Sequence, residues 1–170
     1  MNYIAIEHYM QNHPPPDIWL IQETFLKGPP SPAPTYNYYN IYQGPYAVMN
    51  EDRMGLLTLV HYKIKAKNIT PTEANKYFTA IQCENIETGP GKRTTVIVIN
   101  TYLPNIEGRE KAFTQLITFI QACNKPSKQY QIIIGGDFNC KEDHYNLKII
   151  TSYHNLRIIN GKLNNVTRIQ

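Results

Sequence analysis

The segment IIIGGDFNC, residues 132–140, is the most informative stretch of this chain of 170 residues. Its branched apolar run is typical of a buried strand, and the two glycines that follow allow a close approach of backbone or ligand. If the chain stays extended, Asp137 and Asn139 project from one side while Phe138 turns to the core. On turn chemistry alone, an acid and an amide at such a place are more often turn formers that bond their own backbone. The segment therefore predicts a buried strand that ends in polar groups, with both interpretations open.

Other apolar runs predict that this strand belongs to a sheet-rich domain. Strands are expected at residues 17–24, 36–42, 55–61, 77–84 and 94–102, with a short one at 157–159. Helical periodicity is found at residues 3–13, 107–123 and 145–156. The run at 17–24 is expected to be buried on both faces, and the turn-rich stretch at 89–91 predicts a hairpin. Strands mixed with helices that cover sheet faces indicate a layered α/β architecture, which we expect to form a single domain over residues 1–170.

Composition and charge limit the class of protein. The apolar share of 42% is that of a globular protein, and the apolar runs are far shorter than the roughly 20 residues that a membrane span requires. Residues 1–60 hold two basic and five acidic side chains, whereas residues 61–170 hold fifteen and eight. The basic later part is compatible with a polyanion such as nucleic acid, although an ordinary solvated surface is the more common cause of an excess of this size. We expect no membrane association.

The cysteines and the N-terminus indicate where the protein is located. Cys83, Cys123 and Cys140 are odd in number and form no C-x-x-C pair, which favours a reducing compartment without a disulfide or a zinc site. The N-terminus does not have the basic start and apolar stretch of a signal peptide. An intracellular location, nuclear or cytoplasmic, is therefore expected.

Two further strand ends carry side chains with suitable chemistry. Glu23 follows the apolar run at 17–24, and a carboxylate there is a suitable ligand for Mg²⁺ or Mn²⁺, although it is equally typical of an exposed loop. Tyr102 lies in NTYLPN, residues 100–105, where its phenol can hydrogen-bond a phosphate oxygen or simply pack at a strand end. Together with Asp137 and Asn139, these groups form an inventory for metal-assisted phosphoryl transfer.

The tyrosines at residues 36, 38, 39 and 42 have two interpretations. Aromatic rings can stack on nucleic-acid bases, but they are also simply enriched in strands. We expect half-buried strand aromatics here.

The order and spacing of four motifs resemble a known superfamily. QET at 22–24, GLLTLVH at 55–61, NTYLPN at 100–105 and GGDFN at 135–139 look like successive motifs of the endonuclease/exonuclease/phosphatase superfamily. The later stretch LRIINGKLNNVTR, residues 156–168, is similar to a segment of the endonuclease domain of non-LTR retrotransposons. The resemblance implies a four-layered α/β sandwich with two facing mixed sheets, incomplete at its N- and C-terminal strands.

The resemblance also implies roles for the four residues. Glu23 would hold Mg²⁺ or Mn²⁺, and Asp137 would position or activate the attacking water. Asn139 would bind phosphate, and Tyr102 would contact the scissile phosphate. The implied function is a metal-dependent phosphodiesterase that nicks DNA, active as a monomer and without an organic cofactor.

Two features of the superfamily have no counterpart in this chain. The superfamily begins with a strand that ends in an asparagine, and it ends with a Ser-Asp-His segment whose histidine completes the site. None of the histidines at positions 8, 13, 61, 144 and 154 matches that segment, and none is given a role. We therefore expect weak activity or none from this polypeptide alone. The alternatives are a phosphatase acting on small phosphoesters and a non-catalytic remnant or binding module of the same fold.

Overall fold

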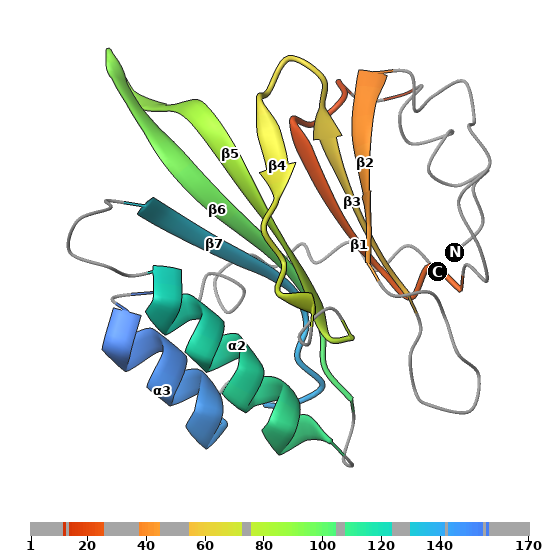
Figure 1. Ribbon diagram of the computed structural model, residues 1–170, viewed down its shortest axis with the longest axis vertical. Coiled ribbons are helices and arrows are strands. Elements are labelled where there is room, and N and C mark those ends of the chain that lie inside the picture. The colour runs from red at the N-terminus through yellow and green to blue at the C-terminus, as the bar shows by residue number, and fades with distance from the viewer. Residues whose placement is uncertain are drawn as a thin grey trace.

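A computed structural model of the protein describes residues 12, 14–25, 38–44, 55–72, 76–104, 108–123, 130–141, 143–154 and 156. Within these residues, a three-stranded sheet and a four-stranded sheet lie face to face. Two helices cover the outer side of the four-stranded sheet (Figure 1). The prediction of an α/β sandwich with two facing sheets is confirmed.

The three-stranded sheet contains β1 (Ile18–Gln22), β2 (Tyr39–Gln43) and β3 (Leu56–His61). Its strand order is β1-β3-β2, and both pairs are antiparallel. All three strands were predicted, with bounds that differ by a few residues. β1 packs against an apolar cluster on each face, as expected, although only Ile21 in this strand is fully buried. The strand lies at an edge of the described sheet, where its neighbours cover it incompletely.

The four-stranded sheet contains β4 (Ala66–Asn68), β5 (Phe78–Gly89), β6 (Lys92–Tyr102) and β7 (Tyr130–Asp137), in that order. β5 and β6 form the predicted hairpin, and β7 pairs with β6 in parallel, which makes this sheet mixed. β7 is not the fully buried strand that its apolar run predicts. Its burial alternates, and Ile133 is 54% exposed, because the helices cover one face of β7 only.

The two helices are α2 (Arg109–Cys123) and α3 (Tyr145–His154). α2 connects the parallel strands β6 and β7, which a tight turn cannot join. Its buried side chains form the predicted apolar stripe, which consists of Ala112, Phe113, Leu116, Phe119 and Ile120. Helical spacing places these residues on one face, so the helix can pack on the sheet and leave its polar face in solvent.

Three apolar clusters hold the layers together. The largest fills the space between the helices and the four-stranded sheet, where Phe78 and Phe119 contact each other with ring centroids 5.3 Å apart. The second lies between the sheets and comprises Val60, Ile81, Cys83, Val96 and Val98. The third covers the other face of the three-stranded sheet and comprises Ile21, Tyr39, Leu57 and Leu59. Each sheet is therefore buried on both faces near its centre.

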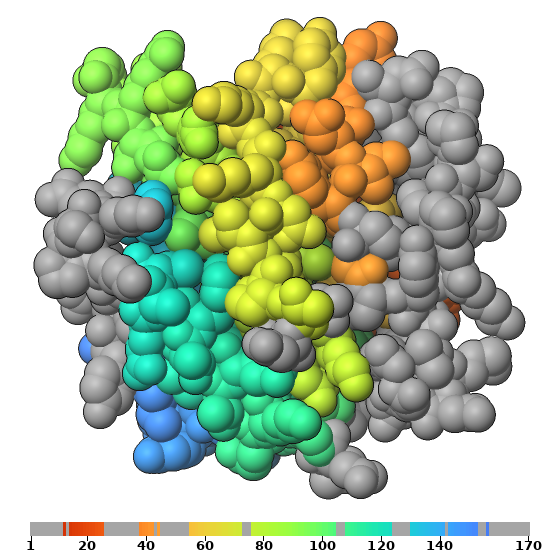
Figure 2. All heavy atoms as spheres, in the orientation of Figure 1, coloured from red at the N-terminus to blue at the C-terminus, as the bar shows by residue number. Residues whose placement is uncertain are grey.

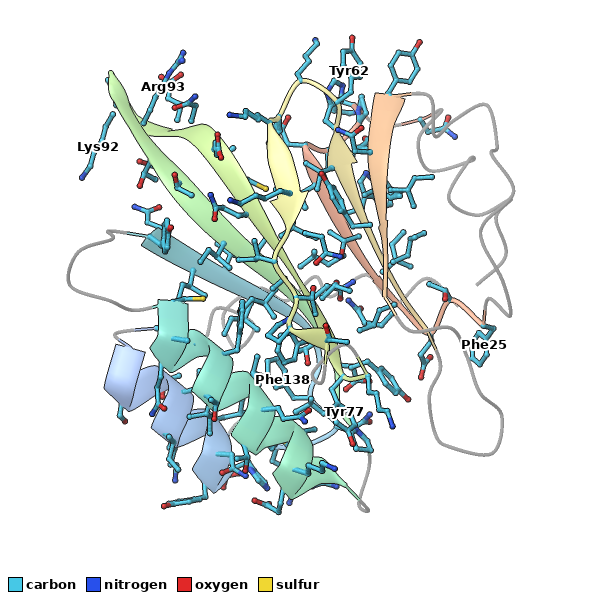
Figure 3. The ribbon with its side chains drawn as sticks, viewed as in Figure 1. Phe25, Tyr62, Tyr77, Lys92, Arg93 and Phe138 are labelled. Carbon is cyan, nitrogen blue, oxygen red and sulfur yellow. The ribbon has the colours of Figure 1, made fainter. Side chains whose placement is uncertain are left out.

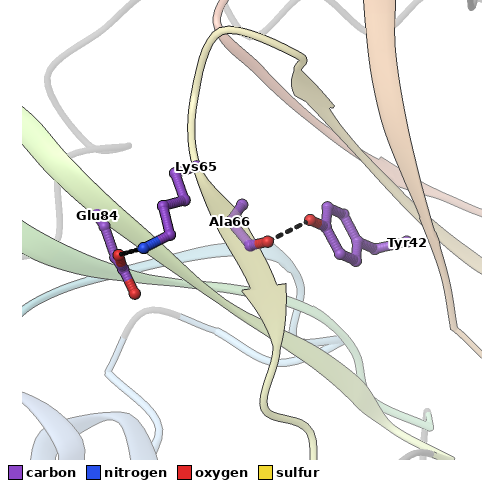
Figure 4. A network of polar contacts seen from close by, with 4 residues as sticks. All are labelled: Tyr42, Lys65, Ala66 and Glu84. Carbon is purple, nitrogen blue, oxygen red and sulfur yellow. Dashed lines mark hydrogen bonds and ion pairs between the residues drawn. The ribbon is translucent and has the colours of Figure 1, made fainter.

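One polar contact joins the edges of the two sheets, and a second lies within the four-stranded sheet (Figure 4). The Tyr42 hydroxyl donates a hydrogen bond to the carbonyl of Ala66 over 2.9 Å, and Lys65 forms a 2.7 Å ion pair with Glu84. Side chains form a continuous surface over β2 and β4 in the view of Figure 2. The contacts of Tyr42 support the interpretation of the tyrosines as ordinary strand aromatics. So does the buried Tyr39, whose hydroxyl donates to the carbonyl of Pro16.

Some predictions fall on parts of the chain that are not described. Nearly all of the first helix at residues 3–13, Tyr36, the short strand at 157–159 and nearly all of the stretch at 156–168 lie outside the described residues. No helix in the described part of the chain is long and apolar enough to cross a membrane.

Candidate active site

Three strands end at the same side of the sandwich, and each end carries one of the predicted site residues. β1 ends at Gln22, directly before Glu23, while β6 ends at Tyr102 and β7 at Asp137. β6 and β7 are parallel, and Tyr102 and Asp137 are register partners in that pair. Carboxyl ends of parallel strands are where α/β proteins collect their functional groups.

Glu23 and Tyr102 contact each other across the two sheets. The Tyr102 hydroxyl donates a hydrogen bond to Glu23 Oε1 over 3.2 Å. Glu23 is exposed and has a φ of 52°, a left-handed conformation that is uncommon for a residue with a side chain. The next residue, Thr24, is buried, and its N–H donates to the carbonyl of Gly55. Thr24 thus anchors the chain just beyond β1, and the Glu23 carboxylate is turned to the side of Tyr102.

Asp137 and Asn139 form a tight turn at the end of β7. The Asn139 N–H donates to Asp137 Oδ1 over 2.8 Å, and Asn139 has a φ of 47°. The chain therefore does not stay extended here, and the prediction from turn chemistry is the correct one. Phe138 packs against the core between the sheet and α2, with its ring centroid 6.3 Å from that of Phe113 (Figure 3).

The turn nevertheless brings both polar groups to the phenol of Tyr102. The Asn139 amide nitrogen donates to the carbonyl of Leu103 over 2.7 Å, which fixes the side chain beside β6. Partial burial raises the pKa of Tyr102, a hydrogen bond from Asn139 lowers it, and the charges of Glu23 and Asp137 raise it further. All four predicted residues consequently lie around one phenolic oxygen.

The glycines before Asp137 serve the close approach of backbone that was predicted. A Cβ added to Gly136 would lie 1.9 Å from the carbonyl oxygen of Thr101, in the neighbouring strand β6. A Cβ on Gly135 would lie 2.5 Å from a methyl group of Leu20 in β1. Glycine therefore lets β7 approach both β6 and β1 directly beside the site.

A buried polar cluster behind the site was not predicted. The side chain of Gln22 donates to Asn100 Oδ1 over 2.6 Å, and the Asn100 amide nitrogen faces Thr58 Oγ1 at 3.2 Å. Thr58 in turn shares a 3.0 Å hydrogen bond with Thr79. Gln22 and Asn100 stand in the QET and NTYLPN motifs, but the sequence does not reveal that these strands face each other.

His144 and His61 take structural positions. His144 precedes α3, and its Nδ1 accepts the N–H of Asn146, while its ring stacks on Phe113 at 5.3 Å. The ring of His61 lies between those of Tyr39 and Tyr62, at the opposite end of β3 from the site.

The donor chemistry of the site fits a hard divalent cation. No group of three or more His, Cys, Asp or Glu side chains able to hold a metal occurs among the described residues. Mg²⁺ does not require such a cage, since it is usually bound by one or two carboxylates together with waters and substrate phosphate oxygens. Glu23 is an exposed carboxylate with a hydroxyl donor at its side, which matches that pattern.

A family profile matches most of this chain. The profile of the Endonuclease/Exonuclease/phosphatase family covers residues 2–164. No curated protein sequence gives a significant match.

Solved structures of low sequence identity share the fold. The endonuclease domain of TRAS1, a telomere-specific non-LTR retrotransposon, is 15% identical with a TM-score of 0.54, covering 88% of this chain and 62% of that one. ANGEL2, a 2′,3′-cyclic phosphatase, is 12% identical with a TM-score of 0.51, covering 88% and 46%. Truncated TDP2 from Caenorhabditis elegans is 20% identical with a TM-score of 0.50, covering 82% and 55%. The chain thus spans less than two thirds of each structure.

Proposed function

Because this chain belongs to the endonuclease/exonuclease/phosphatase family, we propose that it is a divalent-metal-dependent phosphodiesterase that nicks DNA, of the retroelement endonuclease type. The observation that carries the proposal is the contact between Glu23 and Tyr102 beside the Asp137–Asn139 turn. A carboxylate, a phenol, a second carboxylate and an amide from three strand ends meet at one place. These groups suit metal-assisted phosphodiester hydrolysis, in which a carboxylate holds the metal and hydrogen-bonding groups bind the phosphate.

Each side chain has a separate task in this proposal. Glu23 would hold Mg²⁺ or Mn²⁺, which when bound neutralises negative charge that develops on the phosphate. Asp137 would orient the attacking water, because an ionised carboxylate accepts hydrogen bonds from it. The turn restrains Asp137, since one of its oxygens accepts the Asn139 N–H.

Asn139 and Tyr102 would bind the phosphate as donors, and the Tyr102 hydroxyl would turn its single hydrogen from Glu23 to a phosphate oxygen. The Asn139 amide nitrogen carries two hydrogens: one serves the carbonyl of Leu103, and the other, which meets the Tyr102 phenol, would turn to a phosphate oxygen. A phenol is protonated at neutral pH, as a hydrogen-bond donor must be, and the raised pKa of Tyr102 moves its titration further from neutrality. Tyr102 is the last residue of β6, and Asn139 bonds to the carbonyl of Leu103 directly after it. Both donors are therefore held in place, which favours a preorganised site.

DNA is the substrate that the charge distribution supports best. Residues 61–170 carry fifteen basic and eight acidic side chains, and a basic surface attracts a polyanion. The TRAS1 domain, which has the same fold, is a retrotransposon endonuclease.

A supercoiled plasmid with Mg²⁺ provides a sensitive test, because a single nick relaxes the whole molecule. Because the histidine segment of the superfamily has no counterpart in this chain, we expect nicking to be weak. It should require Mg²⁺ and be lost in Glu23→Gln and in Asp137→Asn. Glu87→Gln is the matched control, since Glu87 is an exposed glutamate near the far end of β5, and it should nick like the natural chain. Nicking that persists in both site variants would refute the proposal.

Hydrolysis of small phosphoesters is the second candidate, because ANGEL2 shares the fold and is a 2′,3′-cyclic phosphatase. Release of inorganic phosphate from small phosphoesters, without plasmid nicking, would favour it. A third outcome is a non-catalytic binding module, which would show neither reaction. Thermal stabilisation by Mn²⁺ that depends on Glu23 and Asp137 would indicate in that case that the metal site is intact.

A further inference from the structure

We infer that Asn100, together with Gln22, is a positioning residue that sets the Glu23 carboxylate against the Tyr102 phenol. The inference rests on the proposed function, which gives those two groups their task. It adds to the site a buried contact, the one between Gln22 and Asn100, whose side chains meet between the two sheets.

The contact between Gln22 and Asn100 lies next to the contact between Glu23 and Tyr102, and both connect β1 to β6. Gln22 immediately precedes Glu23 in the chain, and Asn100 precedes Tyr102 by two residues on the same face of β6. Gln22 reaches Asn100 over 2.6 Å, and Tyr102 reaches Glu23 over 3.2 Å. The contact between Gln22 and Asn100 therefore fixes the distance across which Tyr102 can bond to Glu23.

No backbone ladder performs this task in the described part of the chain. β1 belongs to the three-stranded sheet and β6 to the four-stranded sheet, so their hydrogen-bonding edges do not meet. The Asn100 amide nitrogen faces the carbonyls of Ile21 and Leu57 at 3.2 and 3.1 Å. One fully buried side chain thus connects β6 to both β1 and β3.

The polarity of this contact is unexpected if stability is its only purpose. Deeper between the sheets the same layer is apolar, with Val60, Ile81 and Val98. Replacing both partners of a buried polar pair with apolar groups of similar shape is often neutral for stability, whereas an amide pair fixes direction and distance. If Asn100 sets the position of β1 against β6, this explains why amide side chains, and not apolar ones, lie between the sheets next to Glu23.

The test measures whether the contact between Glu23 and Tyr102 depends on Asn100. The reporter is the ring carbon–proton NMR signal of Tyr102 in the full chain, identified by its loss in Tyr102→Phe. Glu23→Gln should displace this signal in the natural chain. The same change should displace it little or not at all in the Asn100→Leu background. An equal displacement in both backgrounds would overturn the inference.

Thr79→Val is the matched control. It also removes a buried polar group of this cluster, but the Thr79 hydroxyl bonds to that of Thr58 in β3 and takes no part in the contact between Gln22 and Asn100. Glu23→Gln should displace the Tyr102 signal fully in this background. If Asn100→Leu does not fold, Gln22→Met removes the same contact from a half-buried position, and the same two outcomes apply.

A second measurement separates this inference from the proposed function. Calorimetric titration with Mn²⁺ alone should give a dissociation constant roughly 10- to 100-fold higher in Asn100→Leu, the usual effect of losing a residue that orients a ligand. Thr79→Val should bind Mn²⁺ like the natural chain. If the natural chain binds no Mn²⁺ while the Tyr102 signal still depends on Asn100, the proposed function fails and the positioning role stands.

Discussion

Replacing Gly136 with alanine tests how tightly β7 is seated beside the site. The added Cβ would lie 1.9 Å from the carbonyl oxygen of Thr101 and 2.8 Å from its carbonyl carbon and its nitrogen. All three are backbone atoms of β6, which cannot turn aside as a flexible side chain can. Gly136 also has a φ of 142°, a conformation that residues with a side chain rarely adopt.

The cost can be built from these two effects. A backbone held in a region that glycine alone adopts freely costs about 1–3 kcal/mol, and overpacking of a close contact costs a further 1–3 kcal/mol or so. Gly136→Ala should therefore lower the free energy of unfolding by roughly 2–6 kcal/mol. For a chain of this length, that corresponds to a fall in Tm on the order of 10 °C.

Two other glycines separate the contributions in the same assay, thermal and urea unfolding followed by the fluorescence of Trp19. Gly91 has a φ of 68° but open space around its Cβ position, so Gly91→Ala should cost only about 1 kcal/mol. Gly89 has open space and no positive φ, so Gly89→Ala should change stability by about 0.5 kcal/mol or less. If Gly136→Ala costs no more than Gly91→Ala, β7 is not seated against β6 as described.

Three further predictions follow from single side chains. Burial raises the pKa of Cys83 from 9.0 to about 11, so the unfolded chain loses this proton first as the pH rises. Stability should be unaffected below pH 9 and fall by roughly 3 kcal/mol from pH 9 through 11, and Cys83→Ala should flatten this part of the pH profile. His144→Ala removes the cap of α3 and the stacking on Phe113, so it should lower the free energy of unfolding by about 1 kcal/mol. Plasmid nicking should continue at the natural rate. A loss of nicking without a loss of stability would contradict the structural role of His144. Tyr102→Phe keeps the ring and removes one hydrogen-bond donor, so kcat for nicking should fall about 100-fold with little change in Tm. Unchanged nicking would show that the phenol does not contact the phosphate.

Much of the fold could be predicted because the signals are local. The Val/Ile-rich run in residues 94–102 and the apolar stripe of α2 are each signals within one element, and both elements occur as expected. The burial of β7 could not be read from its sequence, because Ile132 and Ile133 are the same residue type. Which of the two meets the helices depends on the face that the helices cover.

The candidate site could be predicted in composition but only partly in geometry. Glu23, Tyr102, Asp137 and Asn139 converge as the motifs suggest, although their catalytic roles stay predictions. The left-handed conformation of Glu23 leaves no signal in its residue type, since glutamate has no preference for it. The contact between Gln22 and Asn100 depends on how two sheets face each other, which no local pattern encodes.

The separation of Glu23 and Tyr102 along the chain also bears on how the protein folds. The two residues are 79 positions apart and belong to different sheets, so their contact requires both sheets to have formed and docked. Closing so long a loop costs chain entropy before any distant contact offsets it, and pairings of this kind tend to form slowly. During refolding from denaturant, hairpin structure in β5 and β6 should appear early. The ability to nick DNA should be recovered last and so mark the end of the folding reaction.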